Sequence, residues 1–318
     1  MKNRIVLFLL LFPLVVSAQT FKEWKQRAES GEVEAMHRMG NFYFDGDSVP
    51  QSYKIALQWY QKSAKYNYPN SLHNIAIFYL AGVEVPVDTL QAIHLLRRAA
   101  AQGFTGSMSG LAMIYRNGGT YINPDSCFYW EHKAAELGDA RAQCMLSLYY
   151  ERGFGVKKDL RKAFEWRLKA AEAGDADAIE LVANDYQKGI LVMRDYEKML
   201  YWTKIAAERG RDNSIVWLGV LYQQGLYGVP IDKEKAFSLF QQAAMHGNAW
   251  GQLQLGECYR YGRGTTQDKE QARYWIKKAA EQGYQPAIEA WNEIDTGIDY
   301  DELRRKNEEY KQWFNANR

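Results

Sequence analysis

Serines that stand near a lysine, or inside a glycine-flanked turn, are the residues of this chain that could act as nucleophiles in acyl transfer. Such a serine needs a nearby base, which the lysine of a Ser-x-x-Lys motif supplies. No Ser-x-x-Lys occurs here, and Ser63 and Lys65 stand one residue too close together. Residues 106–110 read Gly-Ser-Met-Ser-Gly, with Met108 where a nucleophile elbow carries serine. We therefore expect no catalytic residue and no enzyme activity.

Five histidines could hold a metal: His37, His73, His94, His132 and His246. Local metal motifs place two ligands three or four residues apart on a helix, and no pair of these histidines has that spacing. His37 and His73 lie one repeat apart, and we expect a solvent-exposed polar column there rather than a metal pair. A Gly-x-x-x-x-Gly-Lys phosphate loop is also absent. The sequence predicts neither a metal nor a cofactor.

The three cysteines, Cys127, Cys144 and Cys258, are an odd number, so at least one thiol stays unpaired in a monomer. Cys127 and Cys144 fall on neighbouring predicted helices but at different heights from the turn between them, which disfavours a disulfide. We expect all three to be small buried hydrophobic residues.

The composition is that of a folded protein, with 47% hydrophobic and 25% charged residues. Lys and Arg number 40 against 38 Asp and Glu, and no run of five basic residues occurs. A net charge of +2 over 318 residues gives no strong field toward nucleic acid or anionic lipid. We expect a protein or peptide partner, and no nucleic acid.

The first 18 residues have the features of a secretory signal peptide. Lys2 and Arg4 supply the positive end, an apolar segment follows, and Val16-Ser17-Ala18 is a small-residue cleavage pattern. The apolar segment is too short to span about 30 Å of hydrocarbon, and no later segment is long enough. The sequence predicts cleavage after Ala18 and export to the periplasm or the exterior, with no integral membrane span.

A repeat of 35 to 37 residues runs through the chain. Its marker residues are Gly31, Asn67, Gly103, Gly138, Gly174, Gly210, Gly247 and Gly283. A tyrosine follows twelve residues after each of the first seven markers, at Tyr43, Tyr79, Tyr115, Tyr150, Tyr186, Tyr222 and Tyr259, and a glycine follows fifteen residues after each. No linker interrupts this register, which favours one continuous stack.

Each repeat is expected to form two helices. Apolar residues at helical spacing follow the marker, and a second helix starts at an N-cap: Ser52, Asp88, Asp125, Asp159, Asp195, Asp232 or Asp268. That helix ends in two small residues and the next marker, where glycine or asparagine accepts a left-handed backbone. A bulky residue eight places before the marker, such as Trp166, should fill the space between helices.

Short hairpins of this kind bury their apolar faces only by stacking. We therefore expect an all-α α-solenoid (superhelix) of helix-turn-helix repeats of about 36 residues. Its predicted organisation is a signal peptide (1–18), an N-terminal capping helix (19–31), seven repeats (32–283) and C-terminal capping helices (284–318).

The units 140–174 and 249–283 carry the fullest pattern: a glycine loop, an Asp cap, a central Trp and Lys-Ala-Ala before the marker glycine. This pattern resembles the Sel-one-like (Sel1) repeat family, relatives of the tetratricopeptide repeats. The resemblance implies an exported α-solenoid adaptor that holds proteins or peptides. Some exported, cysteine-rich members look like weak penicillin-binding or β-lactamase-type enzymes, but the paired cysteines of those members are missing here. A cell-wall enzyme and a structural component of an exported assembly remain the alternatives.

The partner site is expected on the first helices, which in stacked hairpins line the concave wall. The third and seventh residues after each marker are mostly polar, but Trp250 and Trp217 interrupt them in adjacent repeats. They form either an aromatic anchor for a partner or additional core packing. With Arg38, His73 and Arg141, they are the predicted partner-binding residues.

Overall fold

The computed structural model describes residues 21–296, and this part of the chain contains helices and no strand. The predicted signal peptide, and the part of the predicted C-terminal capping region beyond residue 296, lie outside the described residues. The predicted all-α class is confirmed.

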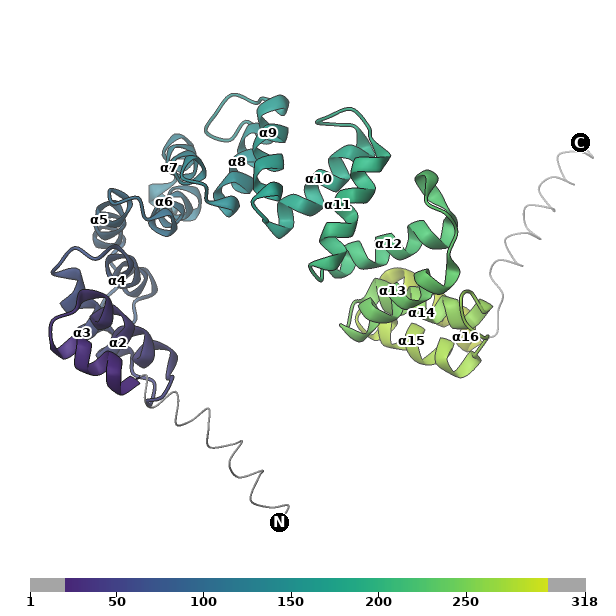
Figure 1. Ribbon diagram of the computed structural model, residues 1–318, viewed down its shortest axis with the longest axis horizontal. Helices are drawn as coiled ribbons and strands as arrows, with labels where there is room; N and C mark the ends of the chain where they lie inside the picture. The colour runs from purple at the N-terminus through teal and green to yellow at the C-terminus, as the bar shows by residue number, and fades with distance from the viewer. Residues whose placement is uncertain (1–20, 297–318) are drawn as a thin grey trace, which may run out of the picture. The chain divides into compact units, whose positions relative to one another are not determined.

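Seven helical hairpins follow one another in register with the markers (Figure 1). Residues 21–29 form a further helix before them. The hairpins are α2 (Val33–Asp45) with α3 (Tyr53–Ala64), α4 (Pro69–Ala81) with α5 (Thr89–Ala100), α6 (Thr105–Asn117) with α7 (Pro124–Glu136), α8 (Ala140–Arg152) with α9 (Leu160–Glu172), α10 (Ala176–Lys188) with α11 (Tyr196–Glu208), α12 (Asp212–Gln224) with α13 (Lys233–Met245), and α14 (Ala249–Tyr261) with α15 (Lys269–Glu281). Helix α16 (Gln285–Thr296) follows, and short 3-10 turns lie at Gly119–Tyr121 and Leu226–Gly228.

Contacts divide the chain into two compact units, Met1–Ala173 (unit 1) and Gly174–Arg318 (unit 2). In unit 1 the helix at 21–29 packs Phe21 and Trp24 on Met36 and Met39 of α2. In unit 2 α16 packs Trp291 and Ile294 on the core that includes Ile276 of α15. The uninterrupted register gave no sign of a boundary between Ala173 and Gly174.

Side-chain caps start the second helices as predicted in six repeats, and the third repeat differs. Ser52, Asp88, Asp159, Asp195, Asp232 and Asp268 each accept a backbone N–H of the first turn. In the third repeat the cap is Asn123, which accepts from Ser126 N at 2.9 Å, and not Asp125. Pro124 explains this shift of two residues. Proline fits the first helical position, so the cap is the residue directly before it, Asn123.

The markers end the second helices in the left-handed conformation, with φ from +77° at Gly210 to +99° at Gly31 and +61° at Asn67. The small residues before them lie where backbones approach closely. A Cβ added at Gly251 of α14 would lie 2.7 Å from Cβ of Ala243 in α13. The predicted left-handed stop at the markers is confirmed, and the small residues before them allow close packing of the helices.

The bulky residues eight places before the markers are less buried than expected. Trp59, Trp130, Trp166 and Trp275 are only half-buried, although Trp202 and Leu95 are buried. The deepest position is the next residue, seven places before the marker, where Tyr60 and Phe240 are almost fully buried. Helical periodicity gives the buried face but does not resolve depth between two neighbouring residues on it.

His37 and His73 do not form the predicted solvent-exposed column. His37 is 7% exposed and His73 is half-buried. Nδ1 of His37 lies 3.0 Å from Oγ of Ser71, and Nδ1 of His73 lies 3.0 Å from Oγ of Ser107. Each histidine therefore joins its own first helix to the first helix of the next repeat, which draws the rings inward.

Candidate functional site

Trp217 and Trp250 line one cavity in unit 2, of about 280 Å³. Trp217 lies on α12 and Trp250 on α14, and both side chains are half-buried. Ala183 of α10 and Met199 of α11 contribute apolar wall. The register alone suggested that the two indoles could meet, and the tertiary structure places them in a common pocket.

Local packing fixes both tryptophans. Trp217 stands between buried Val216 and Leu218 on α12. Trp250 precedes Gly251, whose backbone N–H donates to the N-cap Asn248 at 2.8 Å. Because a Cβ on Gly251 would collide with Ala243, glycine lets the start of α14 approach α13 and sets the height of Trp250.

Polar side chains of α10, α11 and α12 complete the wall of this pocket. They are Glu180, Asn184, Gln187, Thr203, Asn213 and Ser214. The side-chain amides of Asn184 and Gln187 make no hydrogen bond to another described residue. These amides remain available to a ligand as donors and acceptors.

A second, more polar cavity of about 290 Å³ adjoins the first and shares Glu180 and Asn213 with it. Arg211, Asp212 and Asn248 line its remaining walls. We refer to the two cavities together as the unit 2 groove. It runs along α10, α12 and α14, the first helices of three successive repeats, and α11 contributes Met199 and Thr203 to its wall.

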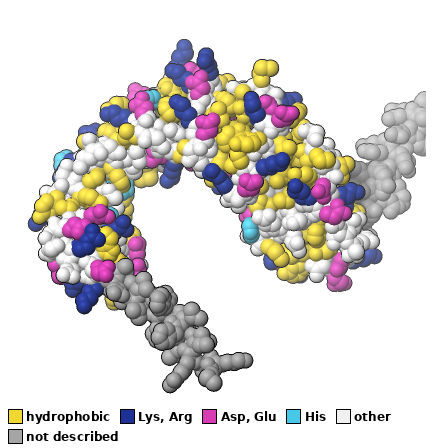
Figure 2. Space-filling view, viewed as in Figure 1, with side chains coloured by type: hydrophobic (Ala, Val, Ile, Leu, Met, Phe, Trp, Pro, Cys, Tyr) yellow, Lys and Arg dark blue, Asp and Glu magenta, His cyan; other side chains and the backbone are white. Residues whose placement is uncertain are grey.

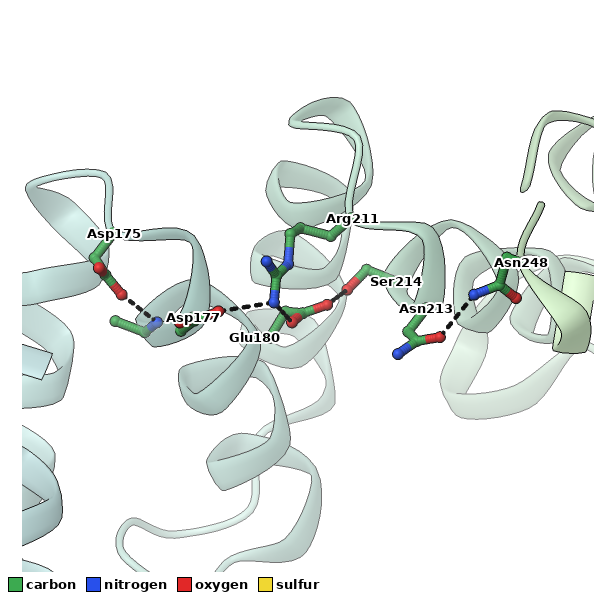
Figure 3. Close-up of polar contacts among 8 residues, drawn as sticks. Asp175, Asp177, Glu180, Arg211, Asn213, Ser214 and Asn248 are labelled. Carbon is green, nitrogen blue, oxygen red and sulfur yellow. Dashed lines mark hydrogen bonds and ion pairs between the residues drawn. The ribbon is translucent and has the colours of Figure 1, made fainter. Parts of the chain in front are cut away.

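Hydrogen bonds between successive first helices hold the polar part of the groove (Figure 3). Nη2 of Arg211 donates to Asp177 at 2.8 Å and to Glu180 at 2.6 Å. Oγ of Ser214 donates to Glu180 at 2.8 Å, and Nδ2 of Asn248 donates to Oδ1 of Asn213 at 3.0 Å. The groove is therefore largely preformed.

The charges in the groove are mostly negative. Glu180 lines both cavities and Asp212 lines the second, Asp177 pairs with Arg211, and Asp212 contacts Nδ1 of His246 at 2.7 Å. The hydrogen bond to Glu180 raises the pKa of Arg211, so this guanidinium stays charged and tied to its carboxylates.

The other predicted binding residues belong to unit 1, where they have local partners or solvent around them. Arg38 pairs with Glu34 at 3.6 Å and lies 5.4 Å from the Trp24 ring. His73 contacts Ser107, as described above, and Arg141 is exposed on α8. The structure therefore joins Trp217 with Trp250 and leaves these three in separate places.

The sequence did not single out Glu180, but a repeated pairing could have found it. Glu180 is the sixth residue after its marker, as are His37 and His73. Each of these three bonds to the serine that is the fourth residue after the next marker. The signal of this hydrogen bond between repeats is therefore a polar residue at the sixth position after one marker and a serine at the fourth position after the next.

Groups with catalytic or metal-binding potential do not gather in the described chain. Among residues 21–294 no group of three His, Cys, Asp or Glu side chains is arranged to hold a metal ion. The three cysteines are buried, as expected. Burial raises the pKa of the Cys258 thiol to about 11, which disfavours the reactive thiolate.

Charges of both signs are mixed on the visible face of the protein (Figure 2). Figure 2 shows Lys and Arg side chains interspersed with Asp and Glu on the face in view. Among the described residues, no helix combines the length and hydropathy that crossing a bilayer requires.

Comparison with known proteins gives a consistent pattern along the whole repeat region. The family model described as "Sel1 repeat" matches seven times, at residues 33–65, 69–104, 106–139, 140–175, 176–210, 213–248 and 251–284. These matches together cover more than half of the chain.

Two solved structures are similar over most of the chain. One is a protective antigen of uropathogenic Escherichia coli with an SLR fold: 30% identity, TM-score 0.73, covering 89% of this chain and 61% of that one. The other is a Sel1 repeat protein of Oxalobacter formigenes. It is 29% identical with a TM-score of 0.68, and the match covers 87% of this chain and 80% of that protein.

Curated relatives match over short stretches. Chitin synthase regulatory factor 3 of Schizosaccharomyces pombe is 41% identical over 59 residues, which is 18% of this chain and 6% of the relative. A protein of Neisseria meningitidis serogroup B is 44% identical over 61 residues, which is 19% of this chain and 13% of the relative. These matches span only a small part of the relatives' lengths.

Proposed function

The chain belongs to the Sel1 repeat family, whose repeats stack into an α-solenoid, and from this we propose that it is a protein- or peptide-binding adaptor. The proposed ligand site is the unit 2 groove, with Trp217 and Trp250 as its anchor residues. Partially exposed tryptophans in a preformed pocket are the residue type that dominates binding hot spots.

The main support for this site is that neither tryptophan ring contacts a cation or an aromatic ring among the described residues. Of the nine tryptophans among the described residues, Trp217 and Trp250 are the two whose rings contact no described cation or aromatic ring. The other seven each have one: Trp24, Trp59, Trp130, Trp166, Trp202, Trp275 and Trp291. Core packing alone does not account for two indoles that line a cavity instead of filling it.

The place of action is proposed from the sequence. The signal-peptide pattern of residues 1–18 supports export to the periplasm or beyond. Fractionation of cells that express the full chain, with mass determination of the mature N-terminus, checks this proposal. A cytoplasmic protein that retains Met1 to Ala18 would contradict it.

Substitution of the anchor residues tests the site. Trp217→Ala or Trp250→Ala should weaken binding by about 2 kcal/mol, because each removes a large apolar contact at the centre of the groove. The measurement is calorimetric titration with a peptide ligand selected from a random library against the unaltered protein. Trp166→Ala is the matched control, since Trp166 is half-buried in unit 1 beside its own Lys169 at 4.3 Å.

The outcomes separate binding from folding. Weaker binding with an unchanged melting temperature supports the groove. A variant that unfolds, or that binds as tightly as Trp166→Ala, would assign the tryptophans to core packing. Turnover of a β-lactam, abolished by one serine substitution, would favour the alternative cell-wall enzyme.

A further inference from the structure

The tryptophan pocket has electron-rich rings and hydrogen-bond acceptors but no basic side chain. Glu180 is its one charged lining residue, and Asn184, Gln187 and Asn213 supply amide oxygens. By contrast, Arg260, Lys269 and Arg273 line a cavity elsewhere in unit 2, and Arg116 and Arg152 line one in unit 1. The lining of the tryptophan pocket thus favours a cation over an anion.

Six of the other seven described tryptophans lie beside a cation of the chain itself, and the seventh, Trp202, contacts the ring of Tyr201. The Nζ atom of Lys62 lies 3.9 Å from the centre of the Trp59 ring, and that of Lys169 lies 4.3 Å from Trp166. In these helices the lysine follows three residues after the tryptophan. The face of an indole attracts a cation through its quadrupole, more strongly where water is excluded.

The same local arrangement is impossible at the groove. Three residues after Trp217 stands Val220, and three after Trp250 stands Leu253. Both are buried, so neither helix supplies a cation to its own indole. Among the described residues, no cation of the chain lies over either ring.

The charges beside the pocket would hold such a cation. Glu180 and Asp212 line the groove; Glu180, like the neighbouring Asp177, accepts a hydrogen bond from Arg211, and Asp212 contacts His246. Arg211 lines the neighbouring cavity and not the tryptophan pocket, and its bonds to Asp177 and Glu180 keep it there (Figure 3). At about 280 Å³ the pocket is just below the roughly 300–1,000 Å³ of small-molecule sites, which suits a single side chain.

We propose that the tryptophan pocket binds the lysine or arginine side chain of a peptide segment, with the cationic head between Trp217, Trp250 and Glu180. This inference rests on the proposed function, since it names the chemistry of the ligand at the same groove. The amides of Asn184, Gln187 and Asn213 would accept hydrogen bonds from the ammonium or guanidinium group.

Pools of short fluorescent peptides with a fixed central residue test this specificity on the full chain. The centre is Arg, Lys, Gln, Leu or Glu, and fluorescence polarisation gives the Kd of each pool. We expect the Arg and Lys pools to bind about tenfold more tightly than the Gln and Leu pools. High salt should narrow this difference, because screening weakens the attraction to Glu180 and Asp212.

Three variants locate the effect. Trp217→Leu should bring the Arg and Lys pools to the affinity of the Gln pool, whereas Trp217→Phe should keep part of their advantage because it keeps a ring. Glu180→Gln removes the charge while keeping a side chain of similar size, and we expect it to reduce the preference for cations about threefold. Trp166→Leu is the control and should leave every pool unchanged.

The results distinguish the two proposals. If the Leu pool binds as tightly as the Arg pool and Trp217→Leu abolishes both, the cation inference is wrong and the groove remains the binding site. If the Arg pool is preferred but Trp217→Leu and Trp250→Leu bind it normally, the cation is bound elsewhere and the inference is also wrong. Absence of binding by every pool would overturn both proposals.

Discussion

In each hairpin, one residue of the first helix and one residue of the second helix complement each other in size. The first-helix residue is the ninth after the marker, and the second-helix residue is the seventh before the next marker. A Cβ added at Gly40 would lie 2.3 Å from Cε1 of Tyr60, and one at Gly219 would lie 2.5 Å from Cε1 of Phe240. The pairs are Gly40 with Tyr60, Ala76 with Leu96, Ala112 with Glu131, Ser147 with Arg167, Ala183 with Thr203, Gly219 with Phe240, and Gly256 with Ile276. Glycine thus occurs where the second helix carries an aromatic ring or Ile276.

Gly219→Ala should destabilise the protein by about 1 to 3 kcal/mol, because the added methyl group collides with a buried ring. Adding Phe240→Leu should recover part of the loss, since Ala with Leu is the pair that the second repeat carries at Ala76 and Leu96. Urea unfolding of the single and double variants measures the coupling. Strictly additive losses would show that the two positions do not share space.

Acidification should weaken the packing around His37. Burial lowers the pKa of His37 to about 4, from an ordinary 6.5. Between these values the unfolded chain binds a proton that the folded chain excludes, so the free energy of unfolding falls as pH falls. Because a tenfold change in proton affinity is worth about 1.4 kcal/mol, the loss from pH 7 to 4 should reach about 2 to 3 kcal/mol.

Comparison with His37→Gln isolates this effect. Burial raises the pKa of Glu131 in the same unit to about 7, which gives the opposite slope between pH 4.5 and 7. The difference in unfolding free energy between the native protein and His37→Gln cancels the contribution of Glu131. A difference that does not change with pH would mean that His37 takes up its proton in the folded state without penalty.

At the scale of elements, five of the seven loops that join the two helices of a repeat contain a left-handed residue at the same place, the seventeenth position after the marker. Glycine takes it at Gly155 and Gly264, with φ of +64° and +73°. Ser48, Glu84 and Tyr227 take it with φ of +62°, +59° and +56°, although a side chain disfavours this conformation. The geometry of the two flanking helices therefore overrides the local preference of the residue.

The Asn123 cap should matter more than the acid that follows it. Asn123→Ala should cost about 1 kcal/mol of stability, because it leaves first-turn N–H groups of α7 without their acceptor. Asp125→Ala removes only a first-turn charge and should cost about 0.3 to 1 kcal/mol at low salt. Thermal or urea unfolding of the two variants ranks them, and a larger effect at Asp125 would contradict the cap assignment.

At the scale of the whole molecule, three markers accept a hydrogen bond from the following repeat through their carbonyl oxygen. Arg209 donates to Gly174 O at 2.6 Å, Gln102 to Asn67 O at 2.8 Å, and Gln282 to Gly247 O at 3.1 Å. In each case the donor is the residue just before the next marker. Such contacts between neighbours make stability a sum of local terms, as expected of a repeat protein.

Gly174→Val should therefore cause local damage. A β-branched residue is strained at φ of +96°, and its Cβ would lie 2.9 Å from Nη1 of Arg209, so we expect a loss of about 1 to 2 kcal/mol. Hydrogen exchange should rise first in α10 and α11, while α4 and α5 stay protected. Gly174→Asn is the control, because Asn67 holds the same place with a left-handed backbone. A uniform loss of protection would indicate one cooperative core.

The sequence by itself determined the elements of this protein. Helices, the left-handed markers and six of the seven caps depend on residues within a few positions of one another, and a register kept through seven repeats makes those local signals unambiguous. The same register put Trp217 and Trp250 on the first helices of adjacent repeats, at the seventh and third positions after their markers. The family likewise followed from the repeat pattern, which the matches at 33–284 confirm.

Only the tertiary structure decided depth and partnership. Periodicity predicted an exposed His37, but contact with Ser71 of the next repeat buries it. The lysine over Trp166 is readable from the sequence, because Lys169 follows three residues later on the same helix. The cavity at Trp217 was not readable, because Trp250 and Glu180, which line it as well, come from other repeats. Burial and contacts of this second kind depend on how neighbouring repeats pack, and local sequence does not encode that packing.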